Sequence, residues 1–180
     1  MQKTRKILIG MGAFAVIAYL LNKKSVIQKA KELIKGFEGL RLKAYKDSRG
    51  IPTIGYGSTS YALVPGLVKR FGRTAVKMGD TITEAEANQL LDVYIDQLAT
   101  KITQALKRPN PTPNQLAALI SLGYNLGPAG LLNSSVFKLY NVSTPILETA
   151  AQFDKYVYAG GERNKGLVNR RAAEKKVFIA

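Results

Sequence analysis

The stretch from Gly36 to Ser58, GFEGLRLKAYKDSRGIPTIGYGS, joins the end of a predicted helix to a predicted β-hairpin. Upstream of it, apolar residues recur at the spacing of one helical face, and Gly39 ends that pattern, so the predicted helix ends at Glu38. Downstream, apolar and polar residues alternate on either side of the turn-forming segment Asp47-Ser48-Arg49-Gly50. We therefore predict a hairpin over about 41–58.

Three polar side chains in this stretch are candidates for the hydrolysis of a glycosidic bond: Glu38, Asp47 and Thr53. Such a reaction needs one carboxylic acid to protonate the leaving oxygen and one carboxylate to activate water or attack the sugar. Glu38 ends the apolar helix face, where burial favours the protonated form, whereas Asp47 lies in a polar turn that favours the ionised form. The Thr53 hydroxyl is suited to holding a water beside Asp47.

Each of these residues also has a purely structural explanation. A charge at a helix end is often solvated, aspartate is common in turns, and glycines such as Gly55 and Gly57 can mark β-bulges. The presence of both carboxylates and the hydroxyl in one short window favours catalysis, in which the two glycines would let a sugar approach the backbone. Four tyrosines are assigned to core packing and not to stacking on sugars: Tyr45, Tyr56, Tyr124 and Tyr140.

The residue types that are absent narrow the chemistry further. The chain of 180 residues contains no Cys, no His and no Trp, which excludes thiol nucleophiles, serine–histidine triads, disulfides and Cys/His zinc sites. Its hydrophobic fraction of 46% and charged fraction of 22% are typical of a single globular domain. Proton transfer would then depend on carboxylates, or on lysines or tyrosines of altered pKa, and no metal or organic cofactor is expected.

The chain is strongly basic, with 27 Lys and Arg against 12 Asp and Glu and a formal charge of +15. This charge predicts attraction to polyanions, which include nucleic acid, anionic lipid and the bacterial envelope. The basic residues are dispersed along helix-like segments, as at Lys101 and Lys107, so a solvated surface that confers solubility is an equally good explanation. No specific nucleic-acid partner is predicted.

Residues 1–24 are predicted to be a membrane segment. The uncharged run ILIGMGAFAVIAYLL, residues 7–21, lies between basic residues and is slightly shorter than the ~17–25 residues of a spanning helix. A cleaved secretory signal is the alternative, but the run ends in Leu-Leu-Asn-Lys without a cleavage site, so we prefer an uncleaved signal anchor. Residues 25–180 would be the catalytic domain on the periplasmic or outer side, and the moderate hydrophobicity of the run leaves release from the membrane open.

The rest of the chain is predicted to be mainly helical, beginning with a helix that starts at Ser25. Capping boxes start two long helices at Thr83 and Thr112, each with its partner three residues later. The region 59–80 is expected to be rich in loops. Shorter helices are predicted near 134–140, 145–156 and 167–178. The predicted fold class is α+β, with a small β-hairpin lobe joined to a helical lobe by one long helix.

From about Ser25 to its C-terminus, the chain resembles the phage lysozymes of the T4 type, glycoside hydrolase family 24. In that family a helix-ending Glu-Gly is followed by a hairpin that carries Asp and Thr, the order and spacing of Glu38, Asp47 and Thr53. The segments GDTITEAEANQLL, LISLGYNLGPAG and GLVNRR are also similar to family segments. Ser58 departs from the members that have histidine after the Gly-x-Gly.

The resemblance implies that Glu38 is the catalytic acid, Asp47 the second carboxylate and Thr53 the nearby hydroxyl. In the family an arginine of the C-terminal helix lies close to the acid, and Arg170 is the matching position here, with Arg171 the second choice. The resemblance also implies a two-lobed lysozyme-like fold. We expect a monomer.

The implied activity is hydrolysis of the β-1,4 bond between N-acetylmuramic acid and N-acetylglucosamine in peptidoglycan, as an endolysin in host cell lysis. We predict inversion at the anomeric carbon, because the Thr53 hydroxyl is useful if it helps Asp47 to hold a water. A lytic transglycosylase or chitinase is the nearest enzymatic alternative, and a transglycosylase would use Glu38 while tolerating loss of Asp47. The other alternative is a basic, membrane-anchored binding protein without enzymatic activity. The presence of Glu38, Asp47 and Thr53 argues against this alternative.

Overall fold

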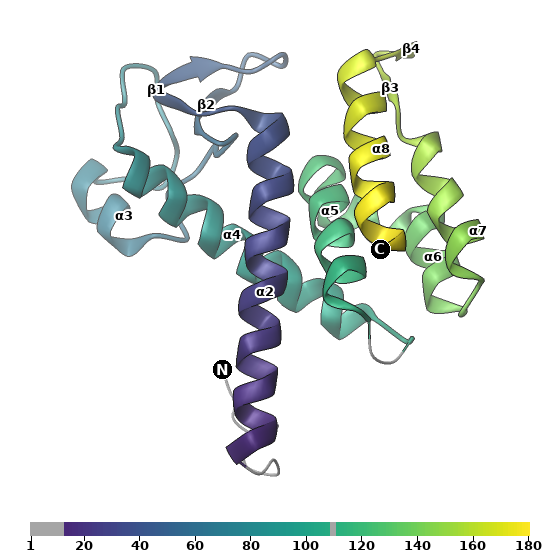
Figure 1. The fold of residues 1–180 in the computed structure, drawn as a ribbon. Coiled ribbons are helices and arrows are strands. Elements are labelled where there is room, and N and C mark those ends of the chain that lie inside the picture. Colours follow the sequence, from purple (N-terminus) through teal and green to yellow (C-terminus); the bar gives the residue numbers. More distant parts are fainter. Residues whose placement is uncertain (1–12, 109–110) are drawn as a thin grey trace.

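The computed structural model describes residues 13–108 and 111–180, and Figure 1 shows two lobes connected by a long helix. The predicted class, α+β and mainly helical, is confirmed, since helices make up most of the described chain and the sheets are small and two-stranded. Of the predicted membrane segment 7–21, residues 7–12 lie outside the described residues. Within the described ranges, no helix combines the length and the apolar character that crossing a membrane requires.

The described helices and strands have the following bounds along the chain: α2 Ala13–Glu38, β1 Arg41–Lys46, β2 Pro52–Gly55, α3 Pro65–Phe71, α4 Glu84–Ala105, α5 Pro113–Asn133, α6 Ser135–Asn141, α7 Ile146–Ala151, the 3-10 helix η1 Gln152–Lys155, β3 Tyr158–Ala159, β4 Glu162–Arg163 and α8 Lys165–Ile179.

Helix α2 ends at Glu38 as predicted, but the chain is already helical at Ala13, the first described residue, so the helix does not start at Ser25. No Gly or Pro separates these two positions, so nothing in the sequence interrupts a helix there. The helix ends because Gly39 adopts a left-handed φ of 67°. Its C-terminal half buries residues such as Ile34 against α4 and α5.

The two predicted capping boxes are confirmed. The Thr83 hydroxyl accepts the N–H of Glu86 at the start of α4, and the Thr112 hydroxyl accepts the N–H of Gln115 at the start of α5. Helix α4 connects the lobes, and α5 lies within the helical lobe, in contact with α2, α4 and α8 (Figure 1). Gly127, with φ 76° and followed by a proline, kinks α5 near its end.

The predicted hairpin is confirmed as the antiparallel pair β1–β2, in which Tyr45 faces Thr53. Two elements were not predicted. Helix α3 lies in the region expected to be loops, and the short hairpin β3–β4 precedes α8. The strands β3 and β4, of two residues each, are too short to give a periodic pattern, whereas α3 lies in a stretch that was interpreted as loops.

Candidate active site

Glu38 is the last residue of α2, and it is fixed by a residue from the end of the chain. Arg170, on α8, donates from Nη1 to Oε1 of Glu38 over 2.6 Å. The Arg170 side chain is only 5% exposed, whereas that of Glu38 is 23% exposed. The expectation that Arg170, and not Arg171, lies beside the acid is therefore confirmed.

Arg170 is itself held by a buried polar cluster. Its Nε donates to Glu174 Oε1 at 3.1 Å, and its Nη2 donates to the carbonyl of Ser121 on α5 at 3.2 Å. Arg171 also donates to Glu174, from Nη2 at 3.0 Å. Burial raises the pKa of Glu174, although the two arginines act in the opposite direction. Glu38 is thus linked through one guanidinium to the core of the helical lobe.

Asp47 is held by its own turn. Its Oδ1 accepts the backbone N–H of Ile51 at 2.8 Å and that of Arg49 at 2.9 Å, an arrangement typical of aspartate in tight turns. The N–H of Ile51 is the main cause that lowers the pKa of Asp47, and the backbone and side chain of Arg49 contribute. This direction agrees with the expectation that Asp47 is ionised.

Thr53 lies on β2 and is buried, at 3% exposed. Its hydroxyl donates to the carbonyl of Ile51 at 2.9 Å, the residue whose N–H binds Asp47. Within the described part of the chain it makes no hydrogen bond to either carboxylate. The pKa of its strand partner Tyr45 is raised, mainly by burial and to a smaller extent by the charges of Glu38 and Asp47, while Arg41 acts in the opposite direction.

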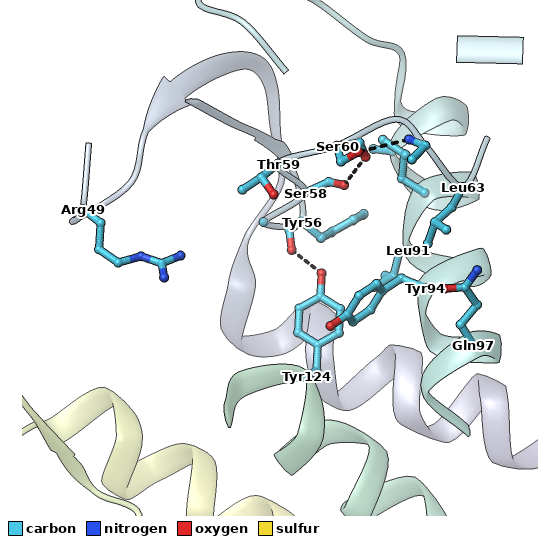
Figure 2. A pocket seen from close by; sticks show the side chains of 14 residues that line it. Arg49, Tyr56, Ser58, Thr59, Ser60, Leu63, Leu91, Tyr94, Gln97 and Tyr124 are labelled. Atoms are coloured by element: carbon cyan, nitrogen blue, oxygen red, sulfur yellow. Dashed lines mark hydrogen bonds between the residues drawn. The ribbon is translucent and has the colours of Figure 1, made fainter. Parts of the chain in front are cut away.

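A cavity of about 430 Å³ opens beside these residues, between the β lobe and α4 (Figure 2). One part of its wall is apolar and another carries hydroxyl and amide groups, which is the combination expected for sugar binding. Its lining residues are Arg49, Tyr56, Gly57, Ser58, Thr59, Ser60, Ala62, Leu63, Ala87, Leu90, Leu91, Tyr94, Gln97 and Tyr124.

Neither candidate carboxylate is among the described residues that line this cavity, but each lies next to a residue that does. A Cβ atom added to Gly57, a lining residue, would lie 3.7 Å from Glu38 Oε2. On the other side, the lining residue Arg49 places Nη2 3.3 Å from Asp47 Oδ2. The expectation for Gly57 is therefore supported by its position. Gly55, by contrast, packs against α4, where an added Cβ would contact Ala87 Cβ at 3.4 Å, and its φ of 66° is a backbone conformation that favours glycine.

Two residues that line the cavity were not predicted as site residues in the sequence analysis. Tyr124 donates from its hydroxyl to the carbonyl of Tyr56 at 2.6 Å, as Figure 2 shows, and burial raises its pKa. Arg49 was treated only as part of a turn. A possible signal was a cation two positions after a candidate carboxylate, but only the folded hairpin reveals that it borders the cavity.

No group of three or more acidic side chains that could hold a metal ion occurs among residues 13–108 and 111–180. The charged groups next to the cavity include two carboxylates, one at a helix end and one in a turn, with an arginine behind the first and a second arginine beside the other. A small β lobe and a helical lobe that place two such carboxylates next to one cavity define a lysozyme-like protein.

Comparison with known proteins identifies the family. Residues 35–174 match the sequence model of the family described as phage lysozyme. The endolysin of Bacillus phage PZA is 35% identical over 158 residues, which cover 85% of this chain and 54% of that endolysin. The SAR-endolysin of bacteriophage PS119 is 33% identical over 144 residues, covering 80% of this chain and 77% of the relative.

Solved structures agree with this assignment. The endolysin from Escherichia coli O157:H7 phage FAHEc1 superposes with a TM-score of 0.69 and 34% identity, covering 84% of this chain and 90% of that one. The chain belongs to the phage lysozyme family, a family of glycosidases, and the resemblance noted in the sequence is confirmed. It spans about half the length of the PZA endolysin that it matches.

Proposed function

We propose that this protein is a muramidase that hydrolyses the β-1,4 bond between N-acetylmuramic acid and N-acetylglucosamine in peptidoglycan and so contributes to host cell lysis. Glu38 is the general acid, Asp47 the general base, and Thr53 assists Asp47. The observation that carries the proposal is that Glu38 and Asp47, from different elements, each lie next to a residue that lines one cavity. Membership of the phage lysozyme family supports the same substrate class.

The reaction follows from the two environments. Arg170 occupies Oε1 of Glu38, which leaves Oε2 on the cavity side to carry the proton. Glu38 gives this proton to the glycosidic oxygen as the bond from that oxygen to the anomeric carbon breaks. Asp47 takes a proton from a water molecule, whose oxygen forms the new bond to the anomeric carbon. The proton from water then returns to Glu38 through solvent, so the enzyme is regenerated.

Replacement of Glu38 tests the proposal directly. The variant Glu38→Gln keeps the shape of the side chain and an oxygen that can accept from Arg170, but it cannot protonate the leaving oxygen. It should fail to release reducing ends from purified peptidoglycan while its circular dichroism spectrum stays unchanged. The matched control is Glu148→Gln, an exposed residue of α7, which should be fully active. Normal activity of Glu38→Gln would remove the assignment.

The stereochemistry of the product separates the enzymatic alternatives. We propose inversion, in which Thr53 helps Asp47 to hold the water on the face opposite the acid. An NMR time course should then show the α-anomer as the first reducing end, and a first-formed β-anomer would overturn inversion. If Asp47→Asn retained most activity and the products carried 1,6-anhydro ends, the protein would be a lytic transglycosylase.

We also propose that residues 1–24 form a signal anchor, with the catalytic domain, 25–180, on the periplasmic or outer side and subsequent release from the membrane. The similarity to a protein named SAR-endolysin supports this proposal. The full chain should sediment with membranes, whereas a shortened chain that begins at Ser25 should be soluble. A mature protein whose first residue lies just after residue 21 would instead identify a cleaved signal peptide.

A further inference from the structure

Arg49 has no strong partner in the folded protein, although it borders the cavity. Its side chain is 74% exposed. Its contacts with Asp47, 3.4 Å from Nε and 3.3 Å from Nη2, are longer than the ~2.7–2.9 Å of a strong charge-assisted hydrogen bond. Nη1 makes no hydrogen bond to the described residues. Because arginine carries five N–H donors, most of the hydrogen-bonding capacity of Arg49 is available to a ligand.

The position of Arg49 places these free N–H donors at the cavity, where a substrate would bind. Figure 2 shows its guanidinium extending from the hairpin turn towards the side of the cavity where Tyr124 lies. Among the described residues that line the cavity, Arg49 is the only charged one, and the polar remainder consists of hydroxyls and the amide of Gln97. Neutral groups of this kind suit the hydroxyl and acetamido groups of sugars, whereas a guanidinium is best matched by a planar anion.

We propose that Arg49 is a specificity-determining residue that binds a carboxylate carried by the glycan strand, and this inference rests on the proposed muramidase function. The carboxylate could belong to the peptide stem of peptidoglycan or to the lactyl group of muramic acid where the stem has been removed. In both cases the guanidinium would form a bidentate hydrogen bond with the carboxylate. This contact would position the acidic group of the substrate next to Asp47. A neutral glycan strand lacks this contact.

The test measures KM and kcat, from release of reducing ends, for the full chain and for Arg49→Gln, which keeps much of the side-chain length but removes the charge. A charge-assisted hydrogen bond at an exposed site corresponds to an increase of about tenfold in KM on intact peptidoglycan, with a smaller change in kcat. Arg49→Lys, which keeps the charge without the planar pair of donors, should fall between the two. The matched control is Lys46→Ala, which removes an exposed cation of the same hairpin that does not line the cavity.

Three substrates locate the anion: intact peptidoglycan, the same material with its carboxyl groups amidated, and peptide-free glycan strands with free lactyl groups. If a stem carboxylate is bound, the KM difference between wild type and Arg49→Gln appears on intact peptidoglycan and disappears on the other two. If the lactyl carboxylate is bound, the difference is largest on peptide-free strands. A measurable difference of the same size on amidated and intact material, or no difference on any of the three substrates, would overturn the inference.

The same experiment distinguishes failure of the inference from failure of the proposed function. A wild-type protein that releases reducing ends but shows no carboxylate-dependent effect of Arg49 would retain the muramidase assignment and lose only the inference. A change that is confined to kcat and equal on all three substrates would mean that Arg49 acts through Asp47. This result would also overturn the inference. A wild-type protein without activity on any of the three would overturn both.

Discussion

Asp47 is held by groups no more than four positions away in the chain, whereas Glu38 is held by Arg170, 132 positions later. The support of Asp47 forms with its own hairpin turn. The support of Glu38 exists only after α2, α5 and α8 have packed, because Arg170 also depends on Ser121 and Glu174. The two carboxylates of one site therefore differ in how much of the protein must be folded before each is in position.

The largest expected effect comes from removing the long-range support. Arg170→Met should lower the free energy of unfolding by about 3–5 kcal/mol, because it leaves a partly buried and a fully buried carboxylate without a common partner. It should also reduce activity. Urea denaturation checks the stability. The control Lys175→Met, also on α8, breaks the exposed ion pair with Asp154 of η1 and should cost less than about 1 kcal/mol. Equal losses of stability in Arg170→Met and Lys175→Met would show that the buried cluster around Arg170 does not stabilise the protein.

Removing the locally held carboxylate should lower activity greatly and stability only slightly. Asp47→Asn retains a side-chain oxygen that can accept the N–H groups of Arg49 and Ile51. We expect kcat to fall about a hundredfold or more, as for loss of a general base, with the urea midpoint nearly unchanged. A loss of stability similar to that of Arg170→Met would contradict the view that the turn forms by itself.

A pair of glycine substitutions separates backbone strain from crowding of the cavity. Gly57 and Gly72 both have positive φ, 99° and 65°, so alanine at either should cost about 1–2 kcal/mol of stability. Only Gly57→Ala brings a methyl group to within 3.7 Å of Glu38 Oε2; at Gly72 nothing lies within 4 Å. We expect kcat/KM on peptidoglycan to fall in Gly57→Ala alone, and equal activity of the two variants would exclude Gly57 from the site.

The smallest effect concerns pH. Because the N–H of Ile51 and then Arg49 lower the pKa of Asp47, the base stays ionised below the ordinary aspartate value of about 3.9. The acidic limb of the kcat/KM profile should therefore lie below that value. Asp47 also contributes stability at neutral pH that is lost as the pH falls through its lowered pKa. An acidic limb above pH 4 that persists in a Glu38→Asp variant would assign another group to it.

The sequence predicted those parts of the fold that depend on neighbouring residues. The capping boxes at Thr83 and Thr112, the hairpin and the helix end at Glu38 were all found where expected. Each depends on residues within a few positions of one another, so the pattern in the chain contains the cause. The start of α2 was misplaced because the apolar run before Ser25 was interpreted as a separate membrane segment.

The site was only partly predictable for the same reason. Glu38, Asp47 and Thr53 stand in one short stretch, but the contact of Glu38 with Arg170 could be anticipated only from the family resemblance. Nothing in the local sequence of Arg49 reveals that it faces a cavity, because that depends on how the hairpin lies against α4. Buried contacts between distant elements are not encoded in any single window of sequence.

Helix α2 runs without a break through 26 residues and ends at the catalytic acid that we propose. In the anchored form, such a helix would act as a spacer of fixed length. At a rise of about 1.5 Å per residue, Glu38 would stand only about 20 Å along the helix from Lys24, where the anchor ends. An anchored enzyme would then reach only glycan bonds that come within this distance of the bilayer surface, and strands farther out would be cut only after the protein had left the membrane.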